Sequence, residues 1–208
     1  MPSLTSTDPG PPVVGARETQ RLRTRARVFD AAVAEIDRSG LAGADVAAIA
    51  AAAAVSRGTF YFHFPTKEHV LVELERAEEV KIVAKLQTRT SEPGDLMSML
   101  TLLAREVLAA EKRLGLVVFR DMLALHFSAT RPVEDEMGEH PLAAYVIATI
   151  AEAQAAGQVS ADADAGELGM FFLTGLFALL ATGATAPGAR SALLDRYVMT
   201  IVRGMENR

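Results

Sequence analysis

Apolar residues recur along most of this 208-residue chain at steps of three and four, the spacing that places them on one face of an α-helix. The first such stretch, residues 18–38, has its apolar positions at Leu22, Ala26, Phe29, Val33 and Ile36. Ser39 and Gly40 end it, because glycine tolerates the left-handed conformation that closes many helices. No segment alternates between apolar and polar residues for long enough to predict a β-strand. The pattern therefore predicts an all-α fold.

Helix caps and turn residues divide the rest of the chain. Asp45 and Ser56 are residue types that cap helix N-termini, and each precedes a short helical stretch. Residues 1–16 are rich in Pro, Ser, Thr and Gly without apolar periodicity, which favours a disordered arm. From these signals and from the breaks at proline and glycine we expect further helices at about residues 46–53, 57–62, 67–88, 95–111, 114–127, 141–156, 164–185 and 189–205.

The composition is that of a globular helical protein. Half of the residues are hydrophobic and the mean hydropathy is +0.20, while the abundance of alanine favours helices. The chain has no cysteine, so disulfides and thiolate metal sites are excluded. The first residues lack the apolar stretch of a secretory signal, and we expect the protein in the cytoplasm.

The net charge of -5 is unevenly distributed. Residues 1–67 carry eight Lys/Arg against six Asp/Glu, a net of +2, whereas the remainder carries thirteen against twenty, a net of -7. Five arginines lie between residues 17 and 27. Because one face of one domain makes the contacts to phosphates, this local excess matters more for nucleic-acid binding than the total charge.

Residues 45–74, DVAAIAAAAAVSRGTFYFHFPTKEHVLVEL, contain two short capped helices about three residues apart. In the second, Phe60 and Phe64 lie one turn apart and are expected to pack inward, while Arg57 and Tyr61 lie on a neighbouring arc. Gly58 costs about 1 kcal/mol of helix propensity relative to alanine, which makes sense where the backbone must approach DNA closely. This layout is typical of a helix-turn-helix. The alternative is that the aromatic residues serve only the core and Gly58 has no role.

The segment VSRGTFYFHFPTKEHVL, with the preceding VFDAAVAEIDRSG and IAAAA, closely resembles the DNA-binding domain of the Tet repressor (TetR) family of bacterial regulators. The resemblance covers about residues 22–74, and the remainder is similar only in length and helical layout. It implies a helix-turn-helix DNA-binding domain over residues 17–66 and a helical ligand-binding and dimerisation domain over residues 67–208.

The resemblance also implies roles for residues of the recognition helix. Arg57, Gly58 and Tyr61 fall where that helix meets the major groove of double-stranded operator DNA. Thr59 and His63 fall where family members touch phosphates or flanking bases. The chemistry is consistent with these roles, because an arginine can bond the guanine edge through two hydrogen bonds and hydroxyl groups can donate to phosphate oxygens.

Three positions around this helix bear on the same resemblance. Lys67 falls where a lysine at the start of the fourth helix holds a phosphate, and a helix N-terminus favours an anion. Ala54 stands where the family's tight turn usually has glycine, so it must adopt a costly left-handed conformation or alter the turn. Asp45 stands near the position where many members begin the second helix with threonine, and its charge would repel a nearby phosphate.

The arginine run before the first helix has two interpretations. Charge alone favours a solvated helix face. Some members of the family use such an arm to reach the minor groove, which is the functional alternative.

Residues 168–189 contain no charged side chain and are long enough to span a membrane. Glycines, threonines and Pro187 dilute this stretch, and a soluble helix that is apolar on all sides must be buried. The family layout pairs the last two long helices with their copies in a four-helix bundle, which implies a homodimer and no membrane. The expected interface residues are Leu168, Phe172, Gly175, Leu179, Leu194, Tyr197, Val198 and Ile201.

A pocket for a small-molecule effector is the second implied feature of this part. The expected lining residues are Met99, Leu103, Phe119, Met122, Leu123, His126, Tyr145 and Phe171. For each of them ordinary core packing is the alternative. His126 and Tyr145 are the candidate polar anchors, and for His126 the alternative is a buried histidine that is satisfied by the protein itself.

No metal, cofactor or catalytic centre is expected. Glu136 and His140 could share a helix face, but the acidic stretch around them precedes Pro141 and has the character of an exposed loop. The chain offers no nucleophile elbow or paired catalytic carboxylates. We therefore expect a one-component regulator, most specifically a repressor, that binds a palindromic operator as a dimer and is released by a small apolar or amphipathic effector. The alternative is a helical-bundle ligand carrier or enzyme with a non-functional helix-turn-helix.

Overall fold

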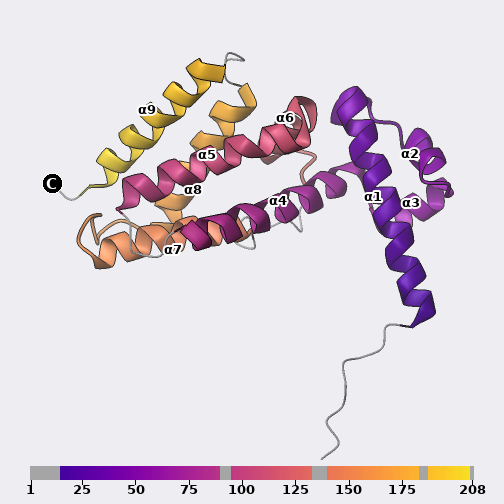
Figure 1. Ribbon diagram of the computed structural model, residues 1–208, viewed down its shortest axis with the longest axis horizontal. Coiled ribbons are helices and arrows are strands. Elements are labelled where there is room, and N and C mark those ends of the chain that lie inside the picture. The colour runs from indigo at the N-terminus through magenta and orange to yellow at the C-terminus, as the bar shows by residue number, and fades with distance from the viewer. Residues whose placement is uncertain (1–14, 90–94, 133–139, 183–186, 207–208) are drawn as a thin grey trace, which may run out of the picture.

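The computed structural model describes residues 15–89, 95–132, 140–182 and 187–206 as two helical lobes (Figure 1). Within these ranges the chain is all-α, and its only strand-like pairing is an isolated bridge between Val159 and Glu206. The helices are α1 (Ala16–Gly43), α2 (Val46–Ala52), α3 (Arg57–His63), α4 (Lys67–Arg89), α5 (Leu96–Leu114), α6 (Leu116–Ala124) with the 3-10 turn η1 (Leu125–Phe127), α7 (Pro141–Ala155), α8 (Ala165–Thr182) and α9 (Pro187–Met205). Each predicted helix is present, with ends shifted by a few residues.

The smaller lobe consists of α1, α2 and α3, and it has its own apolar core. Val28 and Ala32 of α1 pack with Ile49 of α2 and with Phe60 and Phe64. The predicted caps are present. The Asp45 carboxylate accepts a hydrogen bond from the Ala47 amide at 2.8 Å, and the Ser56 hydroxyl accepts one from the Thr59 amide at 3.1 Å. These caps fix where α2 and α3 begin, and therefore which faces the two helices bury.

Two turns of the small lobe use positive φ angles. Gly40 has φ 72°, as predicted, and kinks α1 before a final short turn. Ala54 has φ 50°, so this alanine adopts the left-handed conformation that glycine would adopt without a steric penalty. The turn between α2 and α3 therefore keeps its shape despite the missing glycine.

The larger lobe is a bundle of α4 to α9 around a continuous apolar core. α8 packs against α6, α7 and α9, which explains why much of its surface is apolar. By length and composition alone, α8 is the one helix among the described residues that could cross a membrane, and 33% of that stretch is buried in the bundle. Two of its large apolar side chains, Met170 and Phe171, are exposed.

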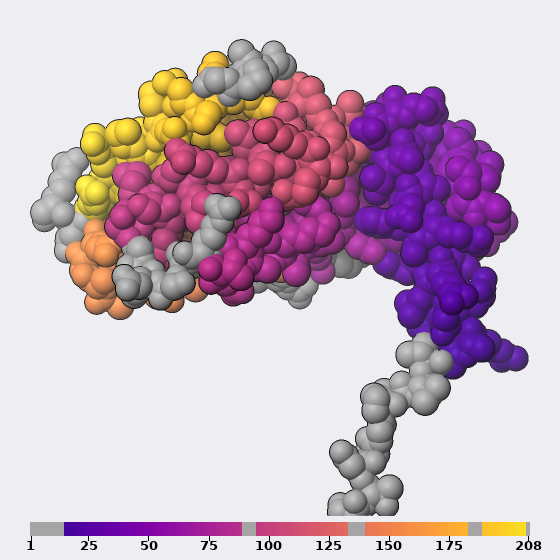
Figure 2. All heavy atoms as spheres, in the orientation of Figure 1, coloured from indigo at the N-terminus to yellow at the C-terminus, as the bar shows by residue number. Residues whose placement is uncertain are grey.

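The two lobes meet where α1 packs against α6 and α4 (Figure 2). The Leu41 amide, just after the Gly40 kink, donates to the Asp121 carboxylate of α6 at 2.6 Å. α4 belongs to both lobes, because Val70 packs in the small core and Leu71 in the large one. A movement of α4 or α6 in the bundle would therefore displace the small lobe directly.

Candidate DNA-binding surface and effector cavity

The helix α3 presents one polar and one apolar face. Phe60 is fully buried, whereas Arg57 and Gly58 are exposed and 47% of the Tyr61 surface is accessible. Nothing approaches the position of a Gly58 β-carbon more closely than 3.7 Å, so the protein itself does not require glycine there. The exposed face is consequently free to lie against another molecule, and it carries the residue types that bond to bases and phosphates.

Thr59 and His63 are half-buried at the edges of this face. The Thr59 hydroxyl lies 2.9 Å from that of Ser56, so it is part of the helix cap as well as of the surface. Burial lowers the pKa of His63, and the positive charges of Arg21 and Arg25 lower it further. These effects favour the neutral form of His63, whose ring can contact a phosphate as a hydrogen-bond donor.

Lys67 has a structural role that the sequence did not indicate. Its Nζ donates to the backbone oxygens of Ala42 at 3.1 Å and Ala44 at 3.2 Å, which ties the start of α4 to the connection between α1 and α2. An ammonium group has three donors, so one remains for a phosphate. A surface hollow beside it is lined by Ala44, Asp45, Val46, Arg57, Tyr61, Pro65, Thr66 and Lys67.

Phe62 is an exposed residue of α3 that sequence reasoning did not single out, with 73% of its surface accessible. Its ring lies edge-on to that of His63, with the centroids 5.1 Å apart. The signal was available, because Phe62 falls off the apolar stripe formed by Phe60 and Phe64. An exposed ring here adds an apolar element to an otherwise polar face.

Two arginines of the predicted basic run are engaged within the protein. Arg21 pairs with Glu18 on the same helix. Arg25 pairs with Glu73 of α4, and its guanidinium lies 4.5 Å from the centroid of the Phe64 ring. Arg17, Arg23 and Arg27 are exposed, as on a solvated helix face. The predicted disordered arm falls largely on residues 1–14, outside the described residues, and Ala16 already belongs to α1.

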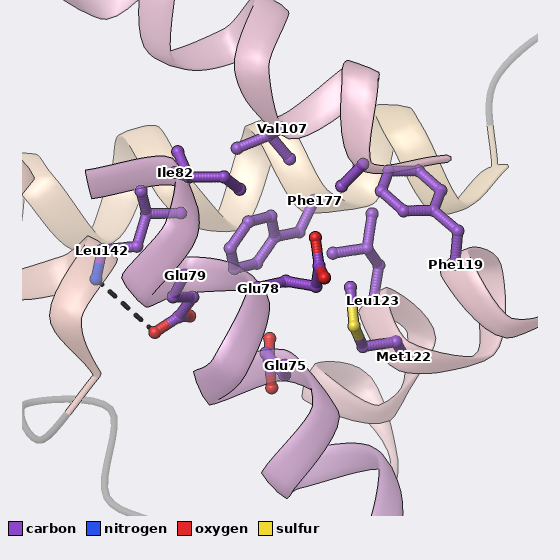
Figure 3. A pocket seen from close by; sticks show the side chains of 11 residues that line it. Glu75, Glu78, Glu79, Ile82, Val107, Phe119, Met122, Leu123, Leu142 and Phe177 are labelled. Atoms are coloured by element: carbon purple, nitrogen blue, oxygen red, sulfur yellow. Dashed lines mark hydrogen bonds between the residues drawn. The ribbon is translucent and has the colours of Figure 1, made fainter. Parts of the chain in front are cut away.

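A narrow cavity of about 20 Å³ lies inside the bundle (Figure 3). Phe119, Met122 and Leu123, three of the expected pocket residues, line it. The other lining residues are Glu75, Glu78, Glu79, Ile82, Val107, Ala110, Leu142 and Phe177. A buried space of roughly 10–15 Å³ holds one water, so this cavity in its present form accepts a water or an ion but no organic molecule.

The remaining predicted pocket residues lie elsewhere. Leu103 is buried in the core outside the cavity wall, and Met99 and Tyr145 are half-buried in the bundle. Phe171 is 63% exposed, which corrects its assignment to an interior pocket: it lies on the outer face of α8. The His126 side chain is 4% exposed and contacts Glu75 through Nε2.

Three buried glutamates of α4 were missed from the sequence. Glu75, Glu78 and Glu79 occupy the apolar stripe that Leu71 and Ile82 define, and that position was the available signal. They face the interior because the helix phase directs them there. Each is paired with cationic or histidine side chains that come from other elements of the bundle or from α4 itself.

The pairing controls the protonation of these carboxyl groups. Burial alone would raise the pKa of Glu78, but hydrogen bonds from Lys81 at 2.6 Å and Arg113 at 2.8 Å outweigh it and hold the pKa below its usual value. Burial raises the pKa of Glu79, and the hydrogen bond with His140 offsets this only in part. Glu78 is thus a firm anion at neutral pH, whereas Glu79 binds a proton more readily.

The expected dimer face differs from the exposed face of α8 and α9. Phe172, Leu194 and Val198 are buried within the protomer and present no surface to a second copy. Tyr197 donates from its hydroxyl to the Phe172 backbone oxygen at 2.6 Å, directly over Gly175. Leu168, Leu179 and Ile201 are half-buried. The exposed large apolar residues of these helices are instead Met170, Phe171 and Met199.

The sequence and the fold were compared with known proteins. The family of bacterial regulatory proteins described as the tetR family matches residues 28–74. Among solved structures, FadR of Thermus thermophilus, a TetR-family repressor in complex with lauroyl-CoA, is 20% identical, with 88% of this chain and 96% of that chain covered at a TM-score of 0.70. FadR of Bacillus subtilis in complex with stearoyl-CoA is 19% identical, with 87% and 99% covered at a TM-score of 0.61.

A third similar structure is the ketosteroid transcriptional regulator KstR2 of Mycobacterium tuberculosis. It is 18% identical, with 88% of this chain and 95% of that chain covered at a TM-score of 0.56. At these identities the likeness establishes a shared fold over nearly the full length of each chain. No curated protein matches the sequence significantly.

Proposed function

This chain belongs to the TetR family of bacterial regulatory proteins, and from that premise we propose that it is a one-component transcriptional repressor. A dimer binds a palindromic operator, and a small apolar or amphipathic effector releases it. The observation that carries the proposal is the face of α3, where Arg57, Gly58 and Tyr61 are exposed above the fully buried Phe60. Such a helix is held by the lobe beneath it and offers polar side chains and backbone, together with the exposed Phe62 ring, to a major groove.

Contacts to the operator follow from the chemistry of the exposed groups. Arg57 reads a base edge and Tyr61 contacts the backbone or a base, while Thr59, His63 and Lys67 bond to phosphates. The spare donor of Lys67 supports this role, because the other two hold the ammonium next to the hollow beside α3. The electrostatic part of the affinity comes from the lobe with a net positive charge.

Dimerisation uses α8 and α9. Their exposed apolar residues Met170, Phe171 and Met199 form the surface available to a second copy. A two-fold dimer presents two copies of α3, so the operator has two half-sites related by a palindrome, about one helical turn apart or somewhat more.

The effector binds in the cavity inside the bundle, whose walls come from α4 to α8. The cavity of about 20 Å³ must widen to admit an organic molecule, and its apolar walls favour an apolar body. The two FadR relatives were solved with acyl-CoA molecules, which supports an effector with a long apolar part. The buried glutamates disfavour an anionic group at this depth, so the charged end of such an effector stays outside.

The effector acts on DNA binding through the contacts between the lobes. Widening the cavity displaces α4 and α6, which carry its walls. The Lys67 and Asp121 bonds then transmit the displacement to the connection between α1 and α2 and to the kink after Gly40. An effector needs only a higher affinity for the displaced state, with a coupling of typically 1–3 kcal/mol.

The proposal is tested by selecting bound fragments from genomic DNA and measuring the affinity for the selected operator. A Tyr61→Ala plus Lys67→Ala variant should lose operator binding and still bind lauroyl-CoA, measured by calorimetry. Lys112→Ala plus Glu152→Ala, both exposed and on α5 and α7, is the matched control and should leave operator binding unchanged. A ligand carrier or enzyme with a non-functional helix-turn-helix predicts instead that no genomic fragment is enriched by the unaltered protein.

A further inference from the structure

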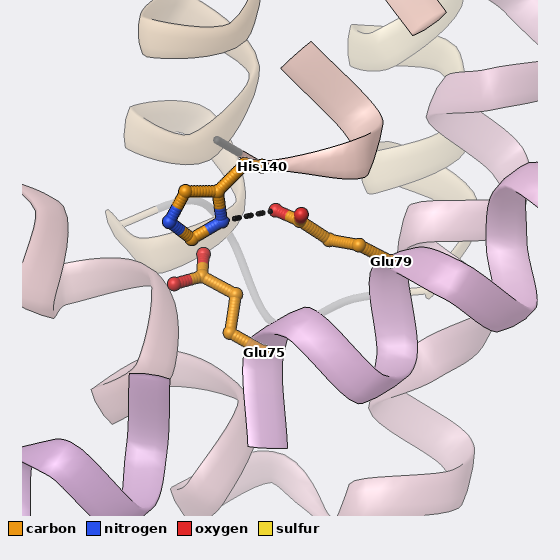
Figure 4. Close-up of side chains that lie close together, drawn as sticks. All are labelled: Glu75, Glu79 and His140. Carbon is orange, nitrogen blue, oxygen red and sulfur yellow. Dashed lines mark hydrogen bonds and ion pairs between the residues drawn. The ribbon is translucent and has the colours of Figure 1, made fainter. Parts of the chain in front are cut away.

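Two carboxylates and an imidazole converge inside the bundle, beside the cavity (Figure 4). Glu75 and Glu79 lie one turn apart on α4, and His140 is the residue that precedes α7. One potential ligand atom from each lies within 4.8 Å of the others, and all three residues are buried. His140 Nδ1 lies 3.0 Å from a Glu79 carboxylate oxygen.

A second imidazole, that of His126, lies beside the cluster of Glu75, Glu79 and His140. His126 contacts Glu75 through Nε2, and its side chain is 4% exposed. Its Nδ1 is buried and has no hydrogen-bond partner among the described residues. The rings of His126 and His140 have their centroids 6.2 Å apart, with Glu75 in contact with the first. Two carboxylates and two imidazoles therefore share one buried site, with one ring nitrogen left unsatisfied.

The charge balance of the cluster favours a further cation. Among the described residues, the guanidinium of Arg131 donates to Glu75 at 3.2 Å and lies 3.3 Å from His140 Nε2. Arg131 thus supplies one formal positive charge, paired with Glu75, beside the two buried carboxylates Glu75 and Glu79. Buried carboxylates are generally paired with a cation, coordinate a metal or take up a proton.

We propose that Glu75, Glu79 and His140, with His126 as a further ligand, bind one divalent first-row transition metal ion such as Zn²⁺, Mn²⁺ or Co²⁺. Mixed imidazole and carboxylate ligands suit these ions, with bonds of about 2.0–2.2 Å. The sequence analysis predicted no metal site, because it did not single out Glu75 and Glu79 in the apolar stripe of α4. The acidic residues 134–139 that were considered then lie outside the described residues.

Metal binding has two chemical consequences. A guanidinium has only donors, so Arg131 faces the acceptor nitrogen Nε2 of His140 and the proton of the neutral ring is on Nδ1, next to Glu79. A metal ion that takes Nδ1 must displace that proton, so binding releases protons and weakens as the pH falls. Arg131 and the metal ion compete for the same carboxylate, so removal of Arg131 strengthens metal binding.

The site also bears on regulation, a consequence that rests on the proposed function. A metal ion would join α4 to the start of α7 and the end of α6. Because Lys67 at the start of α4 holds the connection between α1 and α2, metal binding should change the operator affinity. Metal binding itself is measured without DNA, so its failure and the failure of the proposed function can be told apart.

The test uses the full chain without a histidine tag, stripped of metal with a chelator that is then removed. Calorimetry with Zn²⁺ and Mn²⁺ should show one ion per chain, and Co²⁺ should give the absorption bands of a bound ion. Glu79→Gln and His140→Ala should weaken binding by roughly 10- to 100-fold or more, and Arg131→Met should tighten it. Glu152→Gln, exposed on α7, is the matched control and should bind as the unaltered protein does.

Two results would overturn the proposal. One is that none of the three ions binds at one ion per chain. The cluster would then be only a network of buried hydrogen bonds and ion pairs. The other is stoichiometric binding that Glu79→Gln does not weaken, which would locate the ion elsewhere. Glu79→Gln and Arg131→Met keep the size of the side chain, so the test stands even where His140→Ala fails to fold. Circular dichroism checks the fold of each variant.

Discussion

At the scale of single residues, the protein contains a backbone position that an alanine fills at a cost. Ala54 has φ 50°, a conformation that costs an L-residue about 1–2 kcal/mol. Glycine would avoid this cost, but its greater conformational freedom in the unfolded chain would offset about 0.5–1 kcal/mol of the gain. Ala54→Gly should therefore raise the free energy of unfolding by about 0.5–1 kcal/mol. Urea denaturation measures this. Ala52→Gly, in the last turn of α2, should instead lower stability, and a destabilised Ala54→Gly would contradict the account.

Glu78 contributes a pH-dependent stability whose sign follows from its pKa. Burial opposes ionisation, but Lys81 and Arg113 hold the pKa below the ordinary value of 4.5. A carboxyl group whose pKa is lower in the folded state stabilises the fold above its unfolded pKa, and this contribution is lost as the pH falls through the folded pKa. Glu78→Gln should therefore be less stable than the unaltered protein near neutral pH. The difference should shrink in acid, and a constant difference at every pH would contradict the assignment.

Glu79 should behave in the opposite way. Burial raises its pKa above 4.5, so the folded state binds the proton more tightly than the unfolded state and stability falls as the pH rises from 4.5 through the folded pKa. Glu79→Gln abolishes this fall. In urea denaturation with chelator present, the variant should gain stability relative to the unaltered protein as the pH rises through that window. A relative loss over the same window would show that the hydrogen bond with His140 dominates.

At the scale of the helices, the ends were predictable where a cap or a breaker marks them. Asp45 and Ser56 cap α2 and α3 as expected, and Gly40 kinks α1 with a positive φ. The side of α8 that is exposed could not be predicted from the sequence, because a helix that is apolar on all sides has no polar face to mark it. Phe172, an expected dimer residue of α8, is instead buried within the protomer.

The candidate DNA-binding surface and the buried glutamates were also predictable only in part. The polar face of α3 follows from helical spacing, because Phe60 and Phe64 fix the side that is buried. The bonds from Lys67 Nζ to the backbone oxygens of Ala42 and Ala44 depend on a tertiary approach between α4 and the end of α1. No local pattern reports such an approach. The buried glutamates of α4 were visible as charges in an apolar stripe, but their partners come from distant segments.

The contact between α6 and α1 should matter for the response to the effector. Asp121 accepts a hydrogen bond from the Leu41 amide at 2.6 Å and does not line the cavity. Asp121→Ala should therefore keep effector affinity but reduce the factor by which the effector weakens operator binding, since one of the two links is cut. Lauroyl-CoA titrations in the presence and absence of operator measure that factor. Asp195→Ala on α9 is the control, and an unchanged factor in Asp121→Ala would mean that α6 does not transmit the signal.

At the scale of the whole molecule, the exposed apolar residues of α8 and α9 lie in the bundle, in a different lobe from α3 (Figure 1). Phe171→Glu introduces a charge into this surface, 63% of that phenylalanine being accessible, and should convert a dimer into a monomer without unfolding it. Sedimentation velocity measures the change. Phe62→Glu is the matched control, because Phe62 is 73% exposed on α3, in the other lobe. A Phe171→Glu protein that remained dimeric would assign the interface to another surface.

The separation of the two lobes also defines what each contributes to binding. The small lobe carries the groups of α3 that we propose contact DNA, while the bundle holds the cavity, the buried carboxylates and the exposed apolar surface. A loss of the dimer should therefore weaken operator binding even though every residue of α3 is intact. It should leave the affinity for an effector nearly unchanged.

The central claim is that α3 reads DNA sequence, and the affinity of Arg57→Ala for the selected operator and for a scrambled duplex tests it most directly. The account predicts that the variant loses about 1–3 kcal/mol of binding free energy on the operator and much less on the scrambled duplex. Lys112→Ala, exposed on α5, should keep both affinities. An Arg57→Ala protein that binds the operator as tightly and as selectively as the unaltered protein would contradict the claim.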